Sequence, residues 1–168
     1  ALRAAQTMER PHSPCIKVCV LGPGDRCTGC LRTLEEIGAW SAMSAEQQWA
    51  VIAALERRRQ VAEEVVDRIR THLASSPAVL FMKGTPDFPQ CGFSAQAVAA
   101  LRASGVNSFH AVNIFEDPEL REALKKFSNW PTYPQLYVKG ELVGGCDIVL
   151  DMHRSGELKK VLAEAGAV

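Results

Sequence analysis

The chain has 168 residues, of which 47% are hydrophobic, so it is long enough for one domain or two small ones with a buried core. Nineteen basic residues balance nineteen acidic ones, which leaves no whole-chain field to attract a nucleic acid or an anionic membrane. No apolar run reaches the ~18 residues of a membrane span, and the N-terminus lacks the apolar stretch of a secretory signal. We therefore expect a cytoplasmic protein without a nucleic-acid or membrane partner.

The six cysteines indicate metal ligation or thiol chemistry, because a reducing cytoplasm disfavours disulfides. Four lie in one N-terminal stretch and two lie far apart in the remainder: Cys15, Cys19, Cys27, Cys30, then Cys91 and Cys146. This uneven distribution predicts two modules. We expect a disordered N-terminus over residues 1–12, a four-cysteine module over 13–59, and a second domain over 60–168, with a linker near Arg59.

The four N-terminal cysteines have the spacing Cys-x3-Cys-x7-Cys-x2-Cys. Residues 22–25, Gly-Pro-Gly-Asp, predict a tight turn between the two pairs, and Gly29 would let backbone N–H groups point at the sulfurs. Such a pattern is typical of a metal knuckle, and four thiolates suit zinc as well as iron–sulfur. Disulfides and four unconnected thiols are the alternatives.

A helix is expected after this module, with Ser44 and Gln47 spaced as a capping box at its start. Its apolar residues recur at helical spacing: Trp49, Ile52, Leu55, Val65, Ile69 and Leu73. The pattern can continue as one helix until Ser75-Ser76-Pro77 ends it.

The rest of the chain alternates short apolar runs with helical patterns. Strands are predicted at residues 78–82, 109–114, 135–138 and 141–143, and helices after Cys91, at 118–127 and at 148–164. This order predicts an α/β fold with a mixed sheet.

Cys91 has the clearest chemical context of the six cysteines. It opens Cys-Gly-Phe-Ser after a loop, at the start of a predicted helix, where the helix dipole and free backbone N–H groups stabilise a thiolate. A lone buried structural cysteine is the alternative, but the flanking Pro89, Gln90 and Gly92 disfavour it. A two-cysteine redox centre would carry its resolving thiol three residues later, where this chain has Ser94. The sequence therefore predicts one attacking sulfur without a local partner.

Four motifs occur in the order and spacing of a known family. They are Phe81-Met82-Lys83-Gly84, Cys91-Gly92-Phe93-Ser94, Trp130-Pro131-Thr132-Tyr133-Pro134 and Gly144-Gly145-Cys146-Asp147. On these motifs, the region from about Glu63 to Gly166 resembles the monothiol glutaredoxins of the CGFS type. The resemblance implies a thioredoxin-like α/β fold, a mixed four-stranded sheet flanked by helices, preceded here by the small metal knuckle and its helix.

The resemblance also implies a glutathione-binding groove beside Cys91, which would be both the catalytic thiol and an iron ligand. In this groove Lys83 and Arg121 would hold the glycyl carboxylate of glutathione, and two cations suit such an anion. Without the motif context, both would be interpreted as ordinary surface charges.

The other part of the implied groove is formed by Tyr133, Pro134, Cys146 and Asp147. Pro134 is expected in the cis form, and Tyr133 ahead of it would offer its free backbone N–H and C=O to the glutathione cysteine. Cys146 and Asp147 would receive the γ-glutamyl end. By its burial tendency, Cys146 is a small packed residue rather than a second catalytic thiol.

The resemblance implies a carrier, rather than an enzyme, that binds a [2Fe–2S] cluster with glutathione and transfers it to apoproteins. Such a cluster needs four thiolates, and a homodimer with two glutathiones would supply them, one from Cys91 of each chain. BolA-like proteins and acceptor apoproteins are the implied partners. Two alternatives stay open: an oxidoreductase in which Cys91 attacks a glutathionylated protein, and a redox sensor in which Cys91 and Cys146 form a disulfide.

The region from Ser13 to about Arg58 resembles a small bacterial four-cysteine domain of unknown function, for which iron–sulfur binding has been suggested. The resemblance rests on Ser-Pro-Cys, the Cys-x-x-Cys pair, Glu36-Ile37 and Trp40. We favour iron–sulfur slightly over zinc, because the neighbouring domain is expected to handle clusters. His12, His72, His110 and His153 form no ligand spacing and are assigned no role.

Overall fold

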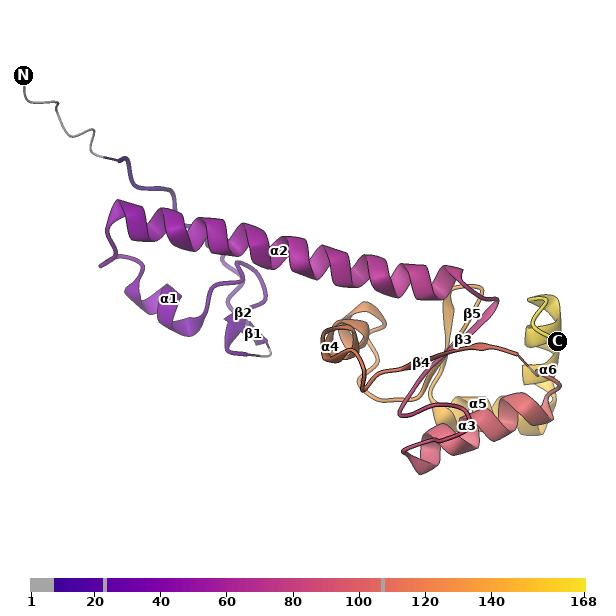
Figure 1. The fold of residues 1–168 in the computed structure, drawn as a ribbon. Coiled ribbons are helices and arrows are strands. Elements are labelled where there is room, and N and C mark those ends of the chain that lie inside the picture. The colour runs from indigo at the N-terminus through magenta and orange to yellow at the C-terminus, as the bar shows by residue number, and fades with distance from the viewer. Residues whose placement is uncertain (1–7, 23, 107) are drawn as a thin grey trace, which may run out of the picture. The chain divides into compact units, whose positions relative to one another are not determined.

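The computed structural model describes residues 8–22, 24–106 and 108–168 (Figure 1). The chain divides into two units, Ala1–Glu63 and Glu64–Val168. The boundary lies inside helix α2 (Ala45–Ala74), so the predicted linker at Arg59 is not a loop. The run that sequence periodicity joined through Leu73 is indeed one helix.

The N-terminal unit contains a two-stranded antiparallel sheet and a short helix. Strand β1 (Leu21–Gly22) pairs with β2 (Arg26–Cys27), and Pro23 of the predicted turn lies outside the described residues. Helix α1 (Leu34–Ala39) was not predicted, although it has a complete capping box. The Glu36 N–H donates to Thr33 Oγ1 (3.1 Å) and the Thr33 N–H donates to the Glu36 carboxylate (2.8 Å).

The start of α2 confirms the predicted capping box. The Gln47 N–H donates to Ser44 Oγ (3.2 Å) and the Ser44 N–H donates to Gln47 Oε1 (2.8 Å). Trp49, placed by its spacing on the apolar face, is in fact 45% exposed, and its Nε1–H donates to the Glu9 carbonyl (2.9 Å). Of the predicted disordered N-terminus, residues 1–7 lie outside the described part of the chain. Glu9 is described, and it is anchored by this bond.

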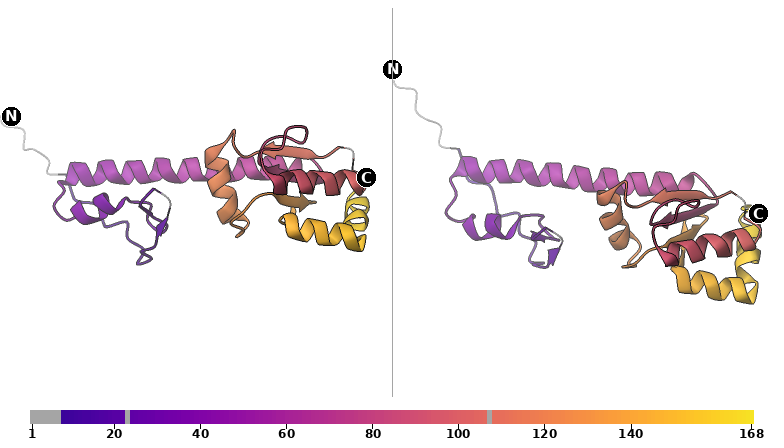
Figure 2. Two further views of the ribbon diagram at one scale, coloured as in Figure 1. Left: turned by 90° about the horizontal axis from the view of Figure 1, so that it is seen from below. Right: turned by 60° about the horizontal axis from the view of Figure 1, so that its bottom comes forward.

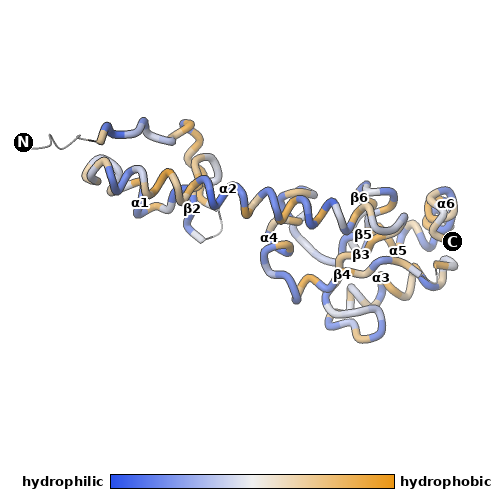
Figure 3. The backbone as a smooth tube through the Cα atoms, turned by 45° about the horizontal axis from the view of Figure 1, so that its top comes forward, coloured by the Kyte–Doolittle hydropathy of each residue, from blue (hydrophilic) through white to orange (hydrophobic). Residues whose placement is uncertain are grey.

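Helix α2 carries apolar residues near both ends, with polar residues between them. Val51 and Leu55 are buried in the N-terminal unit, and Val65, Ile69 and Leu73 are buried in the second unit. Figure 3 shows the alternation of hydrophobic and hydrophilic residues along this helix. Among the described residues, no helix is both long and apolar enough to cross a membrane.

The second unit is built on a four-stranded mixed sheet. Strands β3 (Ala78–Met82), β4 (His110–Asn113), β5 (Gln135–Val138) and β6 (Glu141–Gly144) lie in the order β4-β3-β5-β6. Strand β3 runs parallel to β4 and antiparallel to β5, which pairs antiparallel with β6. This arrangement confirms the predicted mixed sheet with helices on both faces (Figure 2).

The central strand β3 contributes alternate residues to two separate hydrophobic cores, because successive side chains of a strand point to opposite faces. Ala78, Leu80 and Met82 pack with helices α3, α5 and α6. Val79 and Phe81 pack with the end of α2 and with α4. The sheet is therefore covered on both sides, with α3 and α5 side by side in Figure 1.

The helices of this unit are α3 (Gly92–Ala103), α4 (Pro118–Phe127), α5 (Cys146–Ser155) and α6 (Glu157–Glu164). The prediction of one helix over 148–164 is wrong, because the segment is broken at Gly156. That residue has φ +77°, a left-handed conformation that ends α5, and its N–H donates to the His153 carbonyl (3.1 Å). Helix α5 also begins two residues earlier than predicted, at Cys146.

Candidate thiol site and groove

Cys91 is the N-cap residue of α3, with an extended backbone (φ −153°, ψ 135°), and its side chain is half-buried. Its thiol does not cap the helix with a hydrogen bond, but a thiolate there is stabilised by the backbone N–H groups that the first turn leaves unpaired. The pKa of Cys91 is lowered mainly by the Ser94 N–H, and further by the Phe93 N–H, the Lys83 ammonium and the Ser94 hydroxyl. The predicted nucleophile is thus at a position that favours its reactive form.

Ser94 occupies the position where a resolving cysteine would stand. It is completely buried, and its Oγ accepts a hydrogen bond from the Lys83 N–H (3.1 Å). The hydroxyl therefore joins the first turn of α3 to the end of β3, next to the thiol. Replacement of Ser94 by cysteine would therefore remove this hydrogen bond to the Lys83 N–H as well as add a second thiol.

The loop between β3 and α3 brings Lys83 close to Cys91. The Gln90 N–H donates to the Lys83 carbonyl (2.9 Å), and the Gly84 N–H donates to Asn113 Oδ1 (3.0 Å). Gly84 has φ +85°, and a Cβ there would lie 2.7 Å from the Gln90 nitrogen. Only glycine therefore fits the close approach that puts the ammonium beside the sulfur.

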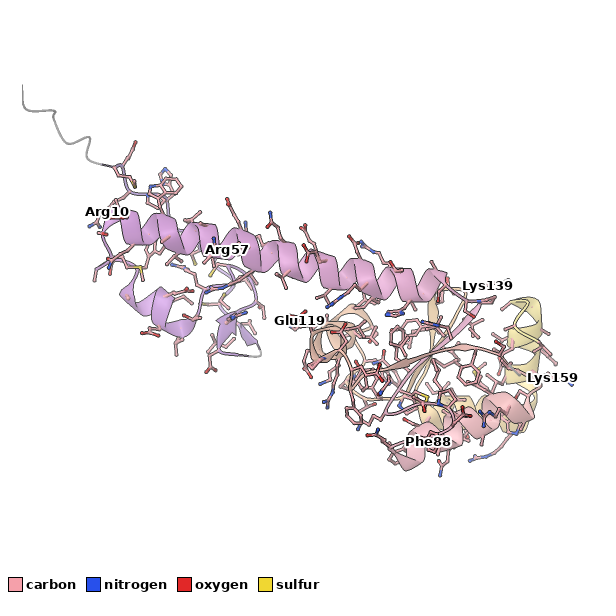
Figure 4. All side chains as sticks on the ribbon, in the orientation of Figure 1. Arg10, Arg57, Phe88, Glu119, Lys139 and Lys159 are labelled. Carbon is pink, nitrogen blue, oxygen red and sulfur yellow. The ribbon has the colours of Figure 1, made fainter. Side chains whose placement is uncertain are left out.

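A groove of about 530 Å³ lies at the same end of the unit. It is lined by every predicted glutathione contact other than Cys91 itself: Lys83, Arg121, Tyr133, Pro134, Cys146 and Asp147. Phe93, from the first turn of α3, also lines the groove and is 58% exposed. Phe88, labelled in Figure 4, is 80% exposed in the loop that precedes Cys91. Two exposed aromatic side chains therefore lie within three residues of Cys91 in the chain.

The segment at Tyr133 is held firmly, although its peptide groups stay open. The Tyr133–Pro134 peptide bond is cis, as expected. The Tyr133 side chain is only 7% exposed, and its hydroxyl donates to the Arg121 carbonyl (2.6 Å). Within the described residues, neither the N–H nor the C=O of Tyr133 bonds to another backbone group. An extended ligand backbone can therefore bond to this segment in the way that an added strand bonds to the edge of a sheet.

Gln135 holds this segment from beneath and was not predicted as a site residue. Its completely buried side chain donates from Nε2 to the carbonyls of Trp130 (3.0 Å) and Thr132 (3.1 Å). Its Oε1 accepts a hydrogen bond from the Tyr137 hydroxyl (3.0 Å). One amide thus fixes two inward-facing carbonyls of the groove wall. The available sequence signal was a polar residue at the start of an apolar strand.

Three cations line the groove: Lys83, Arg121 and Lys125. The Arg121 guanidinium lies over the Phe115 ring (5.7 Å to the centroid), and its Nε is buried without an acceptor among the described residues. Lys125 was missed, although it lies one helical turn after Arg121, on the same face of α4. Its Nζ is 2.8 Å from Glu122. The cluster favours an anionic group at this end of the groove.

Cys146 and Asp147 form the first turn of α5 at the other end of the groove. Cys146 is 6% exposed, and its Sγ donates to Gln96 Oε1 (3.6 Å). Burial raises the pKa of Cys146, and the charges of Asp147 and Cys91 raise it further. This environment agrees with the predicted packed residue rather than a second nucleophile. Gly145, which precedes α5, packs closely against Trp130: a Cβ at this position would lie 3.2 Å from Trp130 Nε1.

The four N-terminal cysteines differ in exposure. Cys27 and Cys30 are buried, whereas Cys15 and Cys19 are exposed. The backbone N–H groups of Cys30 and Gly29 lower the pKa of Cys27. For this sulfur, backbone N–H groups therefore point at the thiol as predicted. In residues 8–22, 24–106 and 108–168, no three His, Cys, Asp or Glu side chains are arranged as a preformed metal site. Metal ligation by these cysteines therefore stays a prediction.

The structure also brings together two histidines that the sequence left without a role. His72 Nδ1 of α2 lies 2.9 Å from His110 Nε2 of β4, and the two rings stack. Burial lowers the pKa of His72, and the neighbouring His110 lowers it further. No sequence spacing could have indicated this pair, because its members are 38 residues apart.

A mixed four-stranded sheet, one thiol at a helix start and a cis-proline segment beside it define a thiol protein of the thioredoxin-like class. The glutaredoxin family model matches residues 78–143, and the model described as a protein of unknown function (DUF1289) matches residues 13–59. With the relatives described next, these findings show that the chain belongs to the monothiol glutaredoxins and carries an additional N-terminal cysteine-containing region.

Curated relatives are similar over more than half of the chain. Monothiol glutaredoxin-5, mitochondrial, of Saccharomyces cerevisiae is 50% identical over 115 residues, 67% of this chain and 77% of that protein. Glutaredoxin 4 of Escherichia coli K12 is 51% identical over 102 residues, 61% of this chain and 88% of that protein. Monothiol glutaredoxin-S11 of Oryza sativa is 57% identical over 102 residues, 61% of this chain but only 21% of the longer rice protein.

Solved structures confirm the predicted fold. Reduced poplar apo GrxS14 is 45% identical with a TM-score of 0.51, and the match covers 63% of this chain and 94% of that one. The holo form of glutaredoxin C1 from Populus tremula x tremuloides is 27% identical with a TM-score of 0.58, covering 65% and 96% of the two chains.

Proposed function

We propose that the second unit binds a [2Fe–2S] cluster together with glutathione and transfers it to apoproteins. The observation that carries this proposal is the pairing of one stabilised thiolate, Cys91, with a buried Ser94 in the place of a resolving thiol. Such a site can bind a soft metal through sulfur, but it cannot close an internal disulfide at that position.

The number of ligands requires a homodimer in this proposal. A [2Fe–2S] cluster is held by four thiolates, and each chain offers one open thiol in this unit, Cys91, because Cys146 is buried. Two chains would supply two thiolates, and two glutathione molecules the other two. The exposed Phe88 and Phe93 beside Cys91 would then be covered on assembly, which apolar burial favours.

Glutathione would lie along the groove in an extended conformation. Its glycyl carboxylate would meet the cations Lys83 and Arg121, and its cysteine would bond the open backbone groups of Tyr133. Its γ-glutamyl end would reach Cys146 and Asp147 at the start of α5. Lys125 adds a third cation at the carboxylate end.

Transfer of the cluster would be a ligand exchange without net oxidation. Each iron–sulfur bond to Cys91 or glutathione that breaks is replaced by one to an acceptor cysteine. Each incoming thiol loses its proton, which the departing thiolate takes up. Acceptor apoproteins are the partners that this step needs, and BolA-like proteins are further proposed partners. We propose the cytoplasm as the compartment, although the name of the yeast relative places that protein in mitochondria.

The test is anaerobic purification with and without glutathione, followed by an absorption spectrum, iron and sulfide analysis, and the molecular mass in solution. We expect a cluster-containing dimer that requires glutathione, and its complete loss in Cys91→Ser. A glutathione-dependent cluster in Cys91→Ser would refute the assignment.

The alternative function is glutathione-dependent thiol exchange, and the lowered pKa of Cys91 favours it. The Cys91 thiolate would attack the glutathionyl sulfur of a protein mixed disulfide and release the protein thiol. A second glutathione thiolate would then attack the Cys91 mixed disulfide and leave as oxidised glutathione. Rapid turnover by cluster-free protein would favour this enzyme, and a Cys91–Cys146 disulfide without turnover would indicate a redox sensor.

We further propose that Cys15, Cys19, Cys27 and Cys30 bind zinc or an iron–sulfur cluster in the N-terminal unit. Four thiolates suit either metal, and backbone N–H groups already face the buried Cys27. Cys15 and Cys19 would have to close over the metal, since no preformed site is found in the described part of the chain. Metal analysis of the Cys91→Ser protein tests this site separately from the first.

A further inference from the structure

Arg32 is a buried cation that has no carboxylate partner in the part of the chain that the structure describes. It is 3% exposed, and its Nε donates to Cys30 Sγ (3.4 Å). Its guanidinium also lies over the Trp40 ring, 5.1 Å from the centroid. Among the ion pairs of the described residues, none includes Arg32.

A second arginine of the same unit, Arg58, is neutralised in the usual way, by a carboxylate. Arg58 bonds both carboxylate oxygens of Glu36 (2.7 and 2.9 Å) and also donates to the Leu31 carbonyl (2.9 Å). Such a bidentate pair neutralises a partly buried guanidinium. Arg32 is more deeply buried, and within the described residues its side chain contacts the Cys30 sulfur and the Trp40 ring but no carboxylate.

The Cys30 sulfur is the contacting group that can carry a negative charge beside Arg32. A buried unpaired cation is costly, and a neutral thiol is only a weak acceptor. A single thiolate would neutralise the guanidinium. A metal bound by four thiolates would also neutralise it, because the centre carries more than one negative charge. Zinc with four thiolates has a net charge of about −2, as does an oxidised [2Fe–2S] cluster with four.

We infer that Arg32 is the counter-charge of an anionic metal–thiolate centre built on Cys30, and that it slows loss of the metal. This inference rests on the proposed metal site of the N-terminal unit. Arg32 does not bind the metal; it acts through the sulfur of Cys30. Mutation of a group that bonds to a metal ligand in this way commonly weakens metal binding by about 10- to 100-fold.

The experiment uses the full chain with Cys91→Ser, so that metal at the second site does not contribute. Protein purified anaerobically is analysed for zinc, iron and sulfide, which distinguishes the two metal chemistries. Loss of metal to excess chelator is then timed in Arg32→Gln, which removes the charge but keeps N–H donors, and in Arg32→Lys, which keeps the charge. Arg58→Met is the matched control, because it removes a partly buried arginine whose charge Glu36 neutralises.

We expect Arg32→Gln to release metal about tenfold faster or more, and Arg32→Lys to stay within about threefold of the parent. Arg58→Met should lower the unfolding midpoint and leave release unchanged. Equal release from Arg32→Gln and the parent would overturn the inference, as would equal acceleration by glutamine and lysine. If Arg32→Gln does not fold, slow release from Arg32→Lys supports the charge and fast release overturns it.

Failure of the underlying site has a different outcome. A parent protein without metal, or one whose metal content is unchanged by Cys27→Ser, would refute the metal site together with the inference. Metal that requires Cys27 but is indifferent to Arg32 would refute the inference alone.

Discussion

Gln135→Met tests whether one buried amide holds the groove wall. Methionine has nearly the same length and shape as glutamine, but it cannot donate to the Trp130 and Thr132 carbonyls or accept from the Tyr137 hydroxyl. The substitution therefore removes hydrogen bonds without opening a large cavity.

The expected cost follows from the three hydrogen bonds that are lost. At about 1 kcal/mol for each bond, Gln135→Met should lower the free energy of unfolding of the second unit by about 3 kcal/mol. Tyr137→Phe removes only one of the three and should cost about 1 kcal/mol. Because that bond is common to both, the double variant should be about as unstable as Gln135→Met alone, a coupling of about 1 kcal/mol.

Urea unfolding of the full chain measures these values. Trp130 becomes the only tryptophan when Trp40 and Trp49, both in the N-terminal unit, are replaced by phenylalanine. Its fluorescence then reports on the groove wall itself, and far-ultraviolet circular dichroism follows the helices in the same sample. Calorimetry with glutathione should show a larger loss of affinity in Gln135→Met than in Tyr137→Phe.

A Gln135→Met protein that unfolds at the urea midpoint of its parent would refute the argument. So would a Tyr137→Phe substitution that costs as much as Gln135→Met, since the hydroxyl contact would then outweigh both carbonyl contacts.

Three other outcomes are expected. Ser94→Ala should raise the pKa of Cys91, because it removes a hydroxyl that stabilises the thiolate, and the pH midpoint of iodoacetamide alkylation should move upward. Lys83→Ala and Arg121→Ala should each weaken glutathione binding by about 1.5–3 kcal/mol in calorimetry, because each removes a charge-assisted bond. His72 takes up its proton at lower pH in the folded chain than in the unfolded chain, so its contribution to stability should be lost as the pH falls below about 6.5. His72→Gln should flatten the pH dependence of the urea midpoint over that range.

Each of these outcomes has a clear contradiction. Lys126→Ala is the control for the two groove cations, since Lys126 is exposed and does not line the groove. Equal affinity losses in all three variants would mean that only overall charge matters. An alkylation midpoint that stays constant in Ser94→Ala would remove the serine hydroxyl from thiolate stabilisation. A midpoint that falls as steeply in His72→Gln as in wild type would show that His72 is not the source of the pH dependence.

The sequence could predict what depends on local pattern. Buried runs such as Ala78–Met82 indicated strands, and the position of Cys91 at a helix start followed from its neighbours. The break at Gly156 was also local, but the apolar spacing around it fits one continuous helix equally well, and this spacing outweighed a single glycine. The backbone angle of a glycine within a helical pattern has to be known before the residue can be assigned to the interior or the end of a helix.

What the sequence could not show depends on contacts between distant residues. Arg32 and Arg58 both lie in the N-terminal unit, yet one bonds a cysteine sulfur and the other a carboxylate. Gln135 becomes a site residue only when the segment before it turns back over its amide. Most residues of the implied glutathione site line one groove, and motif order pointed to them because it carries long-range information that spacing alone does not contain.

The last turns of α2 have a practical consequence for dissecting this protein. Val65, Ile69 and Leu73 complete the core around Phe81 and Tyr137, although the glutaredoxin family model matches only residues 78–143. A gene fragment cut at the edge of that similarity would leave an apolar sheet face open to water and prone to self-association. The smallest portable glutaredoxin from this chain therefore has to keep a length of helix that neither family model covers.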